Sequence, residues 1–121
     1  MTTQARQRAE RLGRLAEWQA VWRLRLAGYS ILARRYKTNL GEIDIVARRG
    51  GVLAFVEVKA RRDFDTGIFA LHGRQFGRVA RAASIFIARH PHYAVCSLRF
   101  DAVLVSGAWP RHLPDVWRPP E

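Results

Sequence analysis

The chain has 121 residues, of which 49% are hydrophobic, so it is long enough for one ordinary core and too apolar for a disordered protein. It carries 21 Lys and Arg against 10 Asp and Glu, a formal charge of +11. This imbalance favours a polyanionic partner, with nucleic acid first. A solvated basic surface or attraction to anionic lipid leaves the acidic pair described below unexplained.

A single cysteine, Cys96, excludes an intrachain disulfide and is expected to be a small buried hydrophobe. Residues 1–8 lack the apolar core of a signal peptide, and no apolar run approaches the length of a membrane span. We therefore expect a cytoplasmic protein without a membrane partner.

Residues 4–26 are predicted to form a helix that ends before Gly28. Large apolar side chains recur on it at three- and four-residue steps, and we expect this stripe to face the core: Leu12, Leu15, Trp18, Trp22 and Leu26. A surface for base stacking is the less favoured interpretation of the tryptophans. Glu17 fits an ordinary ion pair with Arg14, three residues earlier.

A strand is predicted over residues 29–37 and a turn over residues 38–41. Two further apolar, β-branched runs, residues 40–49 and 52–59, flank Gly50-Gly51. Two consecutive glycines between such runs are typical of a tight β-hairpin, because both turn positions can take positive φ.

In a hairpin closed by Gly50-Gly51, Asp44 lies opposite Glu57 and Glu42 lies opposite Lys59. Like charges on opposed positions destabilise a sheet, whereas two carboxylates can share a hard divalent cation. Lys59 points the same way as Glu57 and could stabilise charge beside the metal. A hairpin whose charges face water is the alternative, and a three-residue loop would turn the carboxylates to opposite faces.

A charged loop is predicted over residues 61–67, in which Arg61 and Arg62 are candidate phosphate contacts or solvated side chains. A second helix is predicted over residues 70–89, with an apolar stripe of Phe76, Val79, Ala80, Ala83, Phe86 and Ile87. Another face carries Arg74, Arg78 and Arg81, which fits either nucleic-acid backbone binding or a solvated surface.

His90-Pro91 ends the second helix, because proline disfavours helical geometry in the residue before it. Residues 95–105 are predicted to form the last strand, in which Asp101 fits an ion pair with Arg99 better than an acidic site residue. We expect residues 1–109 to form the domain and residues 110–121, which contain four prolines, to be an irregular tail.

Three blocks carry a family resemblance: residues 41–46 (GEIDIV), residues 55–61 (FVEVKAR) and residues 99–101 (RFD). Together they resemble the YraN-type family of small bacterial proteins, which is similar to the PD-(D/E)XK nucleases and, among them, to archaeal Holliday-junction resolvases. The resemblance covers about residues 11–109. The sequence departs from the family pattern at Ala16, Arg35 and Gln75, where the family has Gly, Asn and Lys.

The resemblance implies a single α/β domain in the order helix, three strands, helix, strand, with a mixed central sheet flanked by helices. It also implies a metal-dependent endonuclease acting on structured or branched DNA. Asp44, Glu57 and Lys59 would be catalytic, and Mg²⁺ or Mn²⁺ would bind Asp44, Glu57, the Val58 carbonyl and Glu17. Glu42 would be a partner of Lys59 or an outer ligand.

Two further expectations follow from the same comparison. The departures from the pattern leave room for a nucleic-acid-binding protein that keeps the scaffold without cutting. Symmetric cutting of a junction requires two active sites, so a homodimer is one expected assembly.

Overall fold

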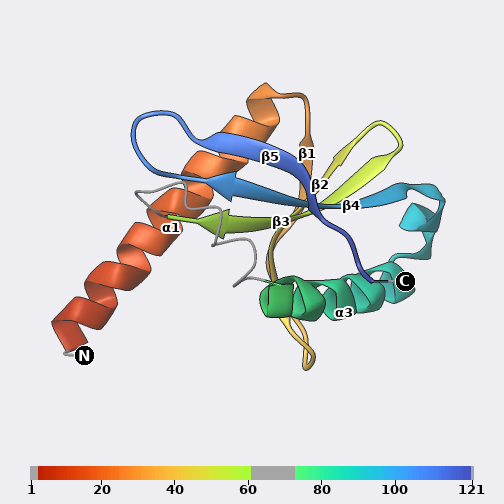
Figure 1. Ribbon diagram of the computed structural model, residues 1–121, viewed down its shortest axis with the longest axis horizontal. Helices are drawn as coiled ribbons and strands as arrows, with labels where there is room; N and C mark the ends of the chain where they lie inside the picture. The colour runs from red at the N-terminus through yellow and green to blue at the C-terminus, as the bar shows by residue number, and fades with distance from the viewer. Residues whose placement is uncertain (1–2, 61–72, 121) are drawn as a thin grey trace.

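The computed structural model describes residues 3–60 and 73–120, without the side chains of residues 8–12, 73 and 74. Its elements in chain order are α1 (Thr3–Leu26), β1 (Ser30–Lys37), β2 (Glu42–Arg49), β3 (Val52–Lys59), α3 (Gly73–Arg89), the 3₁₀ helix η1 (Pro91–Val95), β4 (Ser97–Leu104) and β5 (Arg111–Trp117) (Figure 1). No helix among the described residues is long and apolar enough to cross a membrane.

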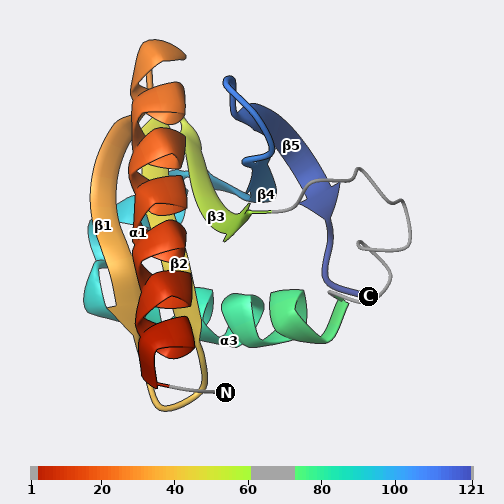
Figure 2. The same cartoon turned by 90° about the vertical axis from the view of Figure 1, so that its left-hand side faces the viewer.

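The five strands form one mixed sheet in the order β1-β2-β3-β4-β5. β3 and β4 are parallel and the other neighbouring pairs are antiparallel. Helices α1 and α3 lie on opposite faces of the sheet (Figures 1 and 2). The predicted single α/β domain with a mixed sheet between helices is confirmed.

The predicted apolar stripe of α3 is confirmed as the contact between that helix and the sheet. Phe76, Val79 and Phe86 are buried against Phe55 and Leu53 of β3. The stripe works as predicted because its large residues recur with the helical period and meet the apolar positions of the central strand. Cys96 is buried in the same cluster, as expected.

The predicted stripe of α1 is wrong at the four residues that the structure describes, and the side chain of Leu12 lies outside the described residues. Its large side chains are 45% to 70% exposed: Leu15, Trp18, Trp22 and Leu26. The buried face consists instead of Ala16, Ala20, Val21 and Leu24. The last three pack on β2 and β3. The two stripes are adjacent on the helix, one residue apart. Periodicity gives the spacing of both stripes, but close packing selects the one in which Ala16 and Ala20 allow the helix to approach the sheet.

The tail predicted to be irregular contains β5, an edge strand antiparallel to β4. Pro114 is tolerated there because an edge strand has one side without ladder partners. The next residue, Asp115, has a φ of 56°, and the register with β4 shifts at this point. The two residues form a bulge, whose backbone geometry the sequence pattern does not reveal.

Asp101 is fully buried and fastens this bulge to β4. It accepts hydrogen bonds from Arg99 at 2.8 and 2.7 Å, from His112 Nε2 at 2.7 Å and from the Asp115 N–H at 3.0 Å. Burial alone would raise the pKa of Asp101, but the hydrogen bonds from Arg99 and His112 outweigh it and lower that pKa. The predicted structural role of Asp101 is confirmed.

We expect Asp101→Ala to lower the free energy of unfolding by about 3 kcal/mol, because it leaves the Arg99 guanidinium and the Asp115 N–H without their buried partner. Urea unfolding followed by circular dichroism measures this loss. Asp115→Asn is the matched control, since it removes only the exposed ion pair with Arg118 and tolerates positive φ. Equal unfolding midpoints for the two variants would contradict the role assigned to Asp101.

Candidate active site

The hairpin formed by β2 and β3 has the predicted register. Arg49 pairs with Val52 and Ile45 pairs with Val56. The ladder stops there, one pair before Asp44 and Glu57, so these two residues are not a ladder pair as predicted. Asp44 Oδ2 instead accepts a hydrogen bond of 2.8 Å from the Val58 N–H. The carboxylate thus takes the place of a backbone acceptor at the point where the strands separate.

Glu57 is 3% exposed, and its two carboxylate oxygens differ in their surroundings. Oε1 lies 3.1 Å from Lys59 Nζ and accepts a hydrogen bond of 2.6 Å from Gln75 Nε2. Oε2 is buried and has no hydrogen-bond partner among the described residues. A buried carboxylate oxygen of this kind is costly unless a proton or a cation satisfies it.

Burial raises the pKa of Asp44 to about 6; the Val58 N–H lowers it and the nearby charge of Glu17 raises it. Burial and the charge of Asp44 raise the pKa of Glu57 to about 7, against the opposing effect of Lys59. The two groups are close enough to titrate as a pair. Near neutral pH the pair therefore has a strong tendency to hold a proton or a divalent cation.

Gln75 is a site residue that sequence reasoning missed as a contact. Its side-chain amide donates to Glu57 and its oxygen accepts from Lys59 Nζ at 3.2 Å. The carboxamide therefore bridges the carboxylate and the ammonium. The sequence signal was present, because Gln75 stands where the similar family has lysine, but only the position of α3 over β3 shows what the amide contacts.

Arg35 interrupts the regular geometry of β1 and connects the sheet to α1. It has a φ of 49° and lies between two residues that pair with Ile45 and Ile43 of β2. Its Nε donates to Glu17 Oε2 at 2.7 Å. Glu17 is thus paired with Arg35 rather than Arg14, and its charge acts on Asp44.

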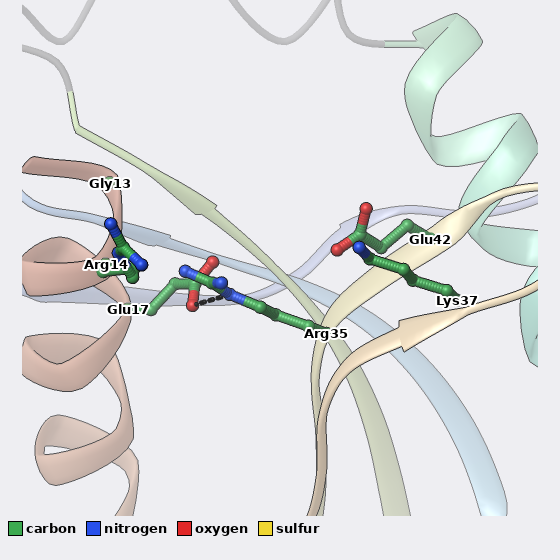
Figure 3. A pocket seen from close by; sticks show the side chains of 6 residues that line it. All are labelled: Gly13, Arg14, Glu17, Arg35, Lys37 and Glu42. Atoms are coloured by element: carbon green, nitrogen blue, oxygen red, sulfur yellow. Dashed lines mark hydrogen bonds and ion pairs between the residues drawn. The ribbon is translucent and has the colours of Figure 1, made fainter. Parts of the chain in front are cut away.

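An open pocket beside this ion pair is lined by charged side chains of three elements. Figure 3 shows Arg14 and Glu17 on α1, Arg35 and Lys37 on β1, and Glu42 on β2, with Gly13 at the edge. Three cations and two carboxylates line it, so it is polar and open to solvent. The charges of both carboxylates, Glu17 and Glu42, contribute to raising the pKa of Asp44.

The pairing predicted between Glu42 and Lys59 is wrong. Lys59 forms its ion pair with Glu57, whereas Glu42 is exposed at the end of β2 and pairs in the ladder with Lys37 of β1. The cause is the separation of β2 from β3 beyond Ile45, which directs the first residues of β2 toward β1 alone.

The predicted metal ligands differ in the contacts that already engage them. Among the described side chains of residues 3–60 and 73–120, no three from His, Cys, Asp or Glu form a group that could hold a metal ion. Of the predicted ligands, Asp44 lies at Val58 beside Glu57, whereas Glu17 is engaged in its ion pair with Arg35. The orphan Oε2 of Glu57 matches the preference of Mg²⁺ and Mn²⁺ for oxygen.

Among the predicted nucleic-acid contacts, Arg78 and Arg81 are exposed on α3. Arg61, Arg62 and the Arg74 side chain lie outside the described residues, so their predicted role is untested.

The conformation of the turn before β2 explains the glycine of the first motif block. Thr38 Oγ1 accepts the Gly41 N–H at 3.0 Å and donates to the Gly41 carbonyl at 2.7 Å. A Cβ on Gly41 would lie 2.7 Å from the carbonyl oxygen of Arg78 in α3. Glycine therefore allows α3 to contact the turn that leads into the site.

We expect Gly41→Ala to destabilise the fold by roughly 1–3 kcal/mol, because the new methyl group overlaps helix backbone that has to move. Gly77→Ala is the matched control: it lies in α3 with open space around its Cβ position, so it should stabilise by roughly 0.5–1 kcal/mol. Thermal unfolding of both variants provides the comparison, and a Gly41→Ala protein as stable as wild type would disprove the close contact.

We expect the stability of the metal-free protein to fall as pH rises from about 4.5 to about 7. The folded chain holds protons on Glu57 and Asp44 that the unfolded chain has released, so folding is favoured at the acid end. The loss should be on the order of 3 kcal/mol for Glu57. Urea unfolding at several pH values measures it.

Two variants test the assignment of this pH dependence. Glu57→Gln should flatten the dependence and be more stable than wild type at pH 8, whereas Glu42→Gln should keep the wild-type slope. A wild-type slope in Glu57→Gln would show that Glu57 is not the group that titrates.

The comparisons with known proteins identify the family. The model of the Uncharacterised protein family UPF0102 matches residues 16–105, which include every element from the end of α1 to β4. A UPF0102 protein of Parvibaculum lavamentivorans is 56% identical over 92% of this chain and 84% of its own length. One from Paramagnetospirillum magneticum is 49% identical over 96% and 94%. These descriptions assign no activity, and the chain belongs to the UPF0102 family.

Proposed function

We propose that this protein is a metal-dependent endonuclease that hydrolyses phosphodiester bonds in nucleic acid, with structured or branched DNA as its substrate. The observation that carries the proposal is the buried carboxylate of Glu57 beside Lys59 and near the half-buried Asp44, with Glu57 Oε2 left without a partner among the described residues. A hairpin selected for stability alone has no reason to hold two like charges close together at the end of its ladder and to bury one of them.

Mg²⁺ or Mn²⁺ fits the site, and Asp44, Glu57 and the Val58 carbonyl would hold it. When bound, the ion supplies Lewis-acid stabilisation of the phosphate and activation of a water nucleophile. Asp44 is already oriented by the Val58 N–H, so its second oxygen is free of that hydrogen bond. Glu17 becomes an additional ligand only where its ion pair with Arg35 opens.

Lys59 provides the fixed positive charge of the site. Its Nζ is oriented by Glu57 on one side and by Gln75 Oε1 on the other. An ammonium held in this way stabilises negative charge that develops on the phosphoryl oxygens or orients the attacking water. Gln75 acts through Lys59 and Glu57, and we assign it a positioning role.

Basic side chains near the site would bind the nucleic-acid backbone. Arg78 and Arg81 are exposed on α3, and the pocket beside Glu17 adds Arg14 and Lys37. We retain Arg61, Arg62 and Arg74 as further phosphate contacts. Contacts of this kind supply affinity without sequence information, so binding should weaken steeply as salt rises.

A non-catalytic nucleic-acid-binding protein is the second candidate. The observation that favours it is the closed hydrogen-bond arrangement of Gln75, which occupies both Lys59 and Glu57. If this arrangement persists on the substrate, Lys59 cannot turn toward a phosphate.

The test compares wild type with Asp44→Asn, Glu57→Gln and Lys59→Met on branched, double-stranded and single-stranded DNA, with Mg²⁺ or Mn²⁺. We expect metal-dependent cutting by wild type and a loss on the order of 100-fold or more in each variant. Asp115→Asn, which alters only an exposed ion pair on β5, should cut like wild type.

Binding without metal separates the two candidates. Each charge-changing variant should still bind branched DNA in low salt, because the arginines proposed to contact the backbone are unchanged in all three. Tight, salt-sensitive binding by wild type with no cutting of any substrate would favour the non-catalytic protein.

A further inference from the structure

The large side chains that α1 leaves exposed form a shallow apolar groove with the loop before β5. Its lining includes Leu15, Trp18, Trp22 and Leu26 of α1 and Trp109 from the loop. The three tryptophans are 45%, 55% and 60% exposed. The groove has a volume of about 300 Å³, at the small end of ligand sites, so it suits one or a few flat groups rather than a helix.

An arginine guanidinium lies over each of these tryptophans. Arg34 is 4.1 Å from the centre of the Trp18 ring and Arg25 is 5.2 Å from that of Trp22. Arg23 is 5.3 Å from Trp109 and also donates to the Pro110 carbonyl at 3.2 Å. Arg23 therefore ties the loop to α1 and holds Trp109 at the groove.

We propose that this groove binds the unpaired bases of a single-stranded segment of nucleic acid. Aromatic rings interleaved with arginines provide flat faces for bases and positive charge for phosphates, the combination typical of single-strand binding. Among the described residues, the groove is lined by Arg23 and by no carboxylate. A polyanion with flat apolar groups therefore matches its charge and its shape.

The inference rests on the proposed function, because it specifies the substrate of the same site. Trp18 directly follows Glu17 in α1, and Arg34 directly precedes Arg35 in β1. Trp18 and Arg34 contact each other at the groove. Their chain neighbours, Glu17 and Arg35, form the ion pair beside Asp44. A strand that stacks on Trp18 would thus extend to the charged pocket beside the carboxylates.

The other occupant of an exposed apolar groove is a protein, including a second copy of this chain. Charge argues against a second copy, since each copy carries a formal charge of +11 and has an arginine over each of these tryptophans. Self-association is nevertheless a definite outcome of the experiment below.

The experiment measures binding of a short fluorescent oligothymidylate and of an abasic oligonucleotide of the same length and charge, both without divalent metal. Trp22→Leu keeps apolar bulk but removes the stacking face, and Trp22→Phe restores an aromatic ring. We expect Trp22→Leu to bind oligothymidylate roughly 5- to 100-fold more weakly, and Trp22→Phe to retain most of the affinity. Binding of the abasic probe should be the same for all three proteins.

Leu98→Ala, at an exposed apolar residue of β4, is the control and should bind both probes like wild type. Equal loss for both probes in Trp22→Leu, or no loss, would overturn the inference. Sedimentation of wild type as a dimer and of Trp22→Leu as a monomer, with unchanged oligothymidylate binding, would assign the groove to self-association.

Cutting is measured separately, so the two proposals can fail separately. If wild type cuts no substrate but Trp22→Leu still loses oligothymidylate binding, the nuclease proposal fails and the base-binding groove stands. If wild type cuts with metal but Trp22→Leu binds oligothymidylate as tightly as wild type, the groove proposal fails and the nuclease proposal stands.

Discussion

The candidate site depends on one constraint: where the β2–β3 ladder ends, the buried carboxylate of Glu57 lies near the half-buried carboxylate of Asp44. Each acid has its own compensating contacts: the Val58 N–H for Asp44, and Lys59 with Gln75 for Glu57. These contacts come from the strand end, the hairpin partner and α3. The site is therefore assembled by the fold as a whole, and one buried oxygen of Glu57 still has no partner among the described residues.

The local parts of this arrangement could be predicted from the sequence. Gly50-Gly51 defines the turn, the turn defines the register as far as Ile45 and Val56, and the large residues of α3 identify its buried face. The failures have a different origin. The buried stripe of α1 depends on how closely the helix packs on the sheet. The left-handed residues Arg35 and Asp115 are not glycines, so the sequence pattern did not identify their backbone geometry.

The site also combines contributions from the helices on both faces of the sheet. Helix α3 supplies Gln75 to Glu57, while α1 supplies Glu17, which is held by Arg35 and acts on Asp44. Sequence reasoning named Glu17 but could not pair it with Arg35, because that contact requires the irregular backbone of β1. It placed Glu42 beside Lys59 because it assumed that the hairpin stays paired to its ends.

Helix α3 touches the hairpin region at two points three residues apart: through Gln75 at Glu57 and through the Arg78 carbonyl at Gly41. About one turn of helix, roughly 5 Å, separates these points. The backbone that packs on Gly41 and the amide that bridges Glu57 and Lys59 therefore belong to the same turn of α3. The missing side chain at Gly41 thus sets how close this amide lies to the acidic pair.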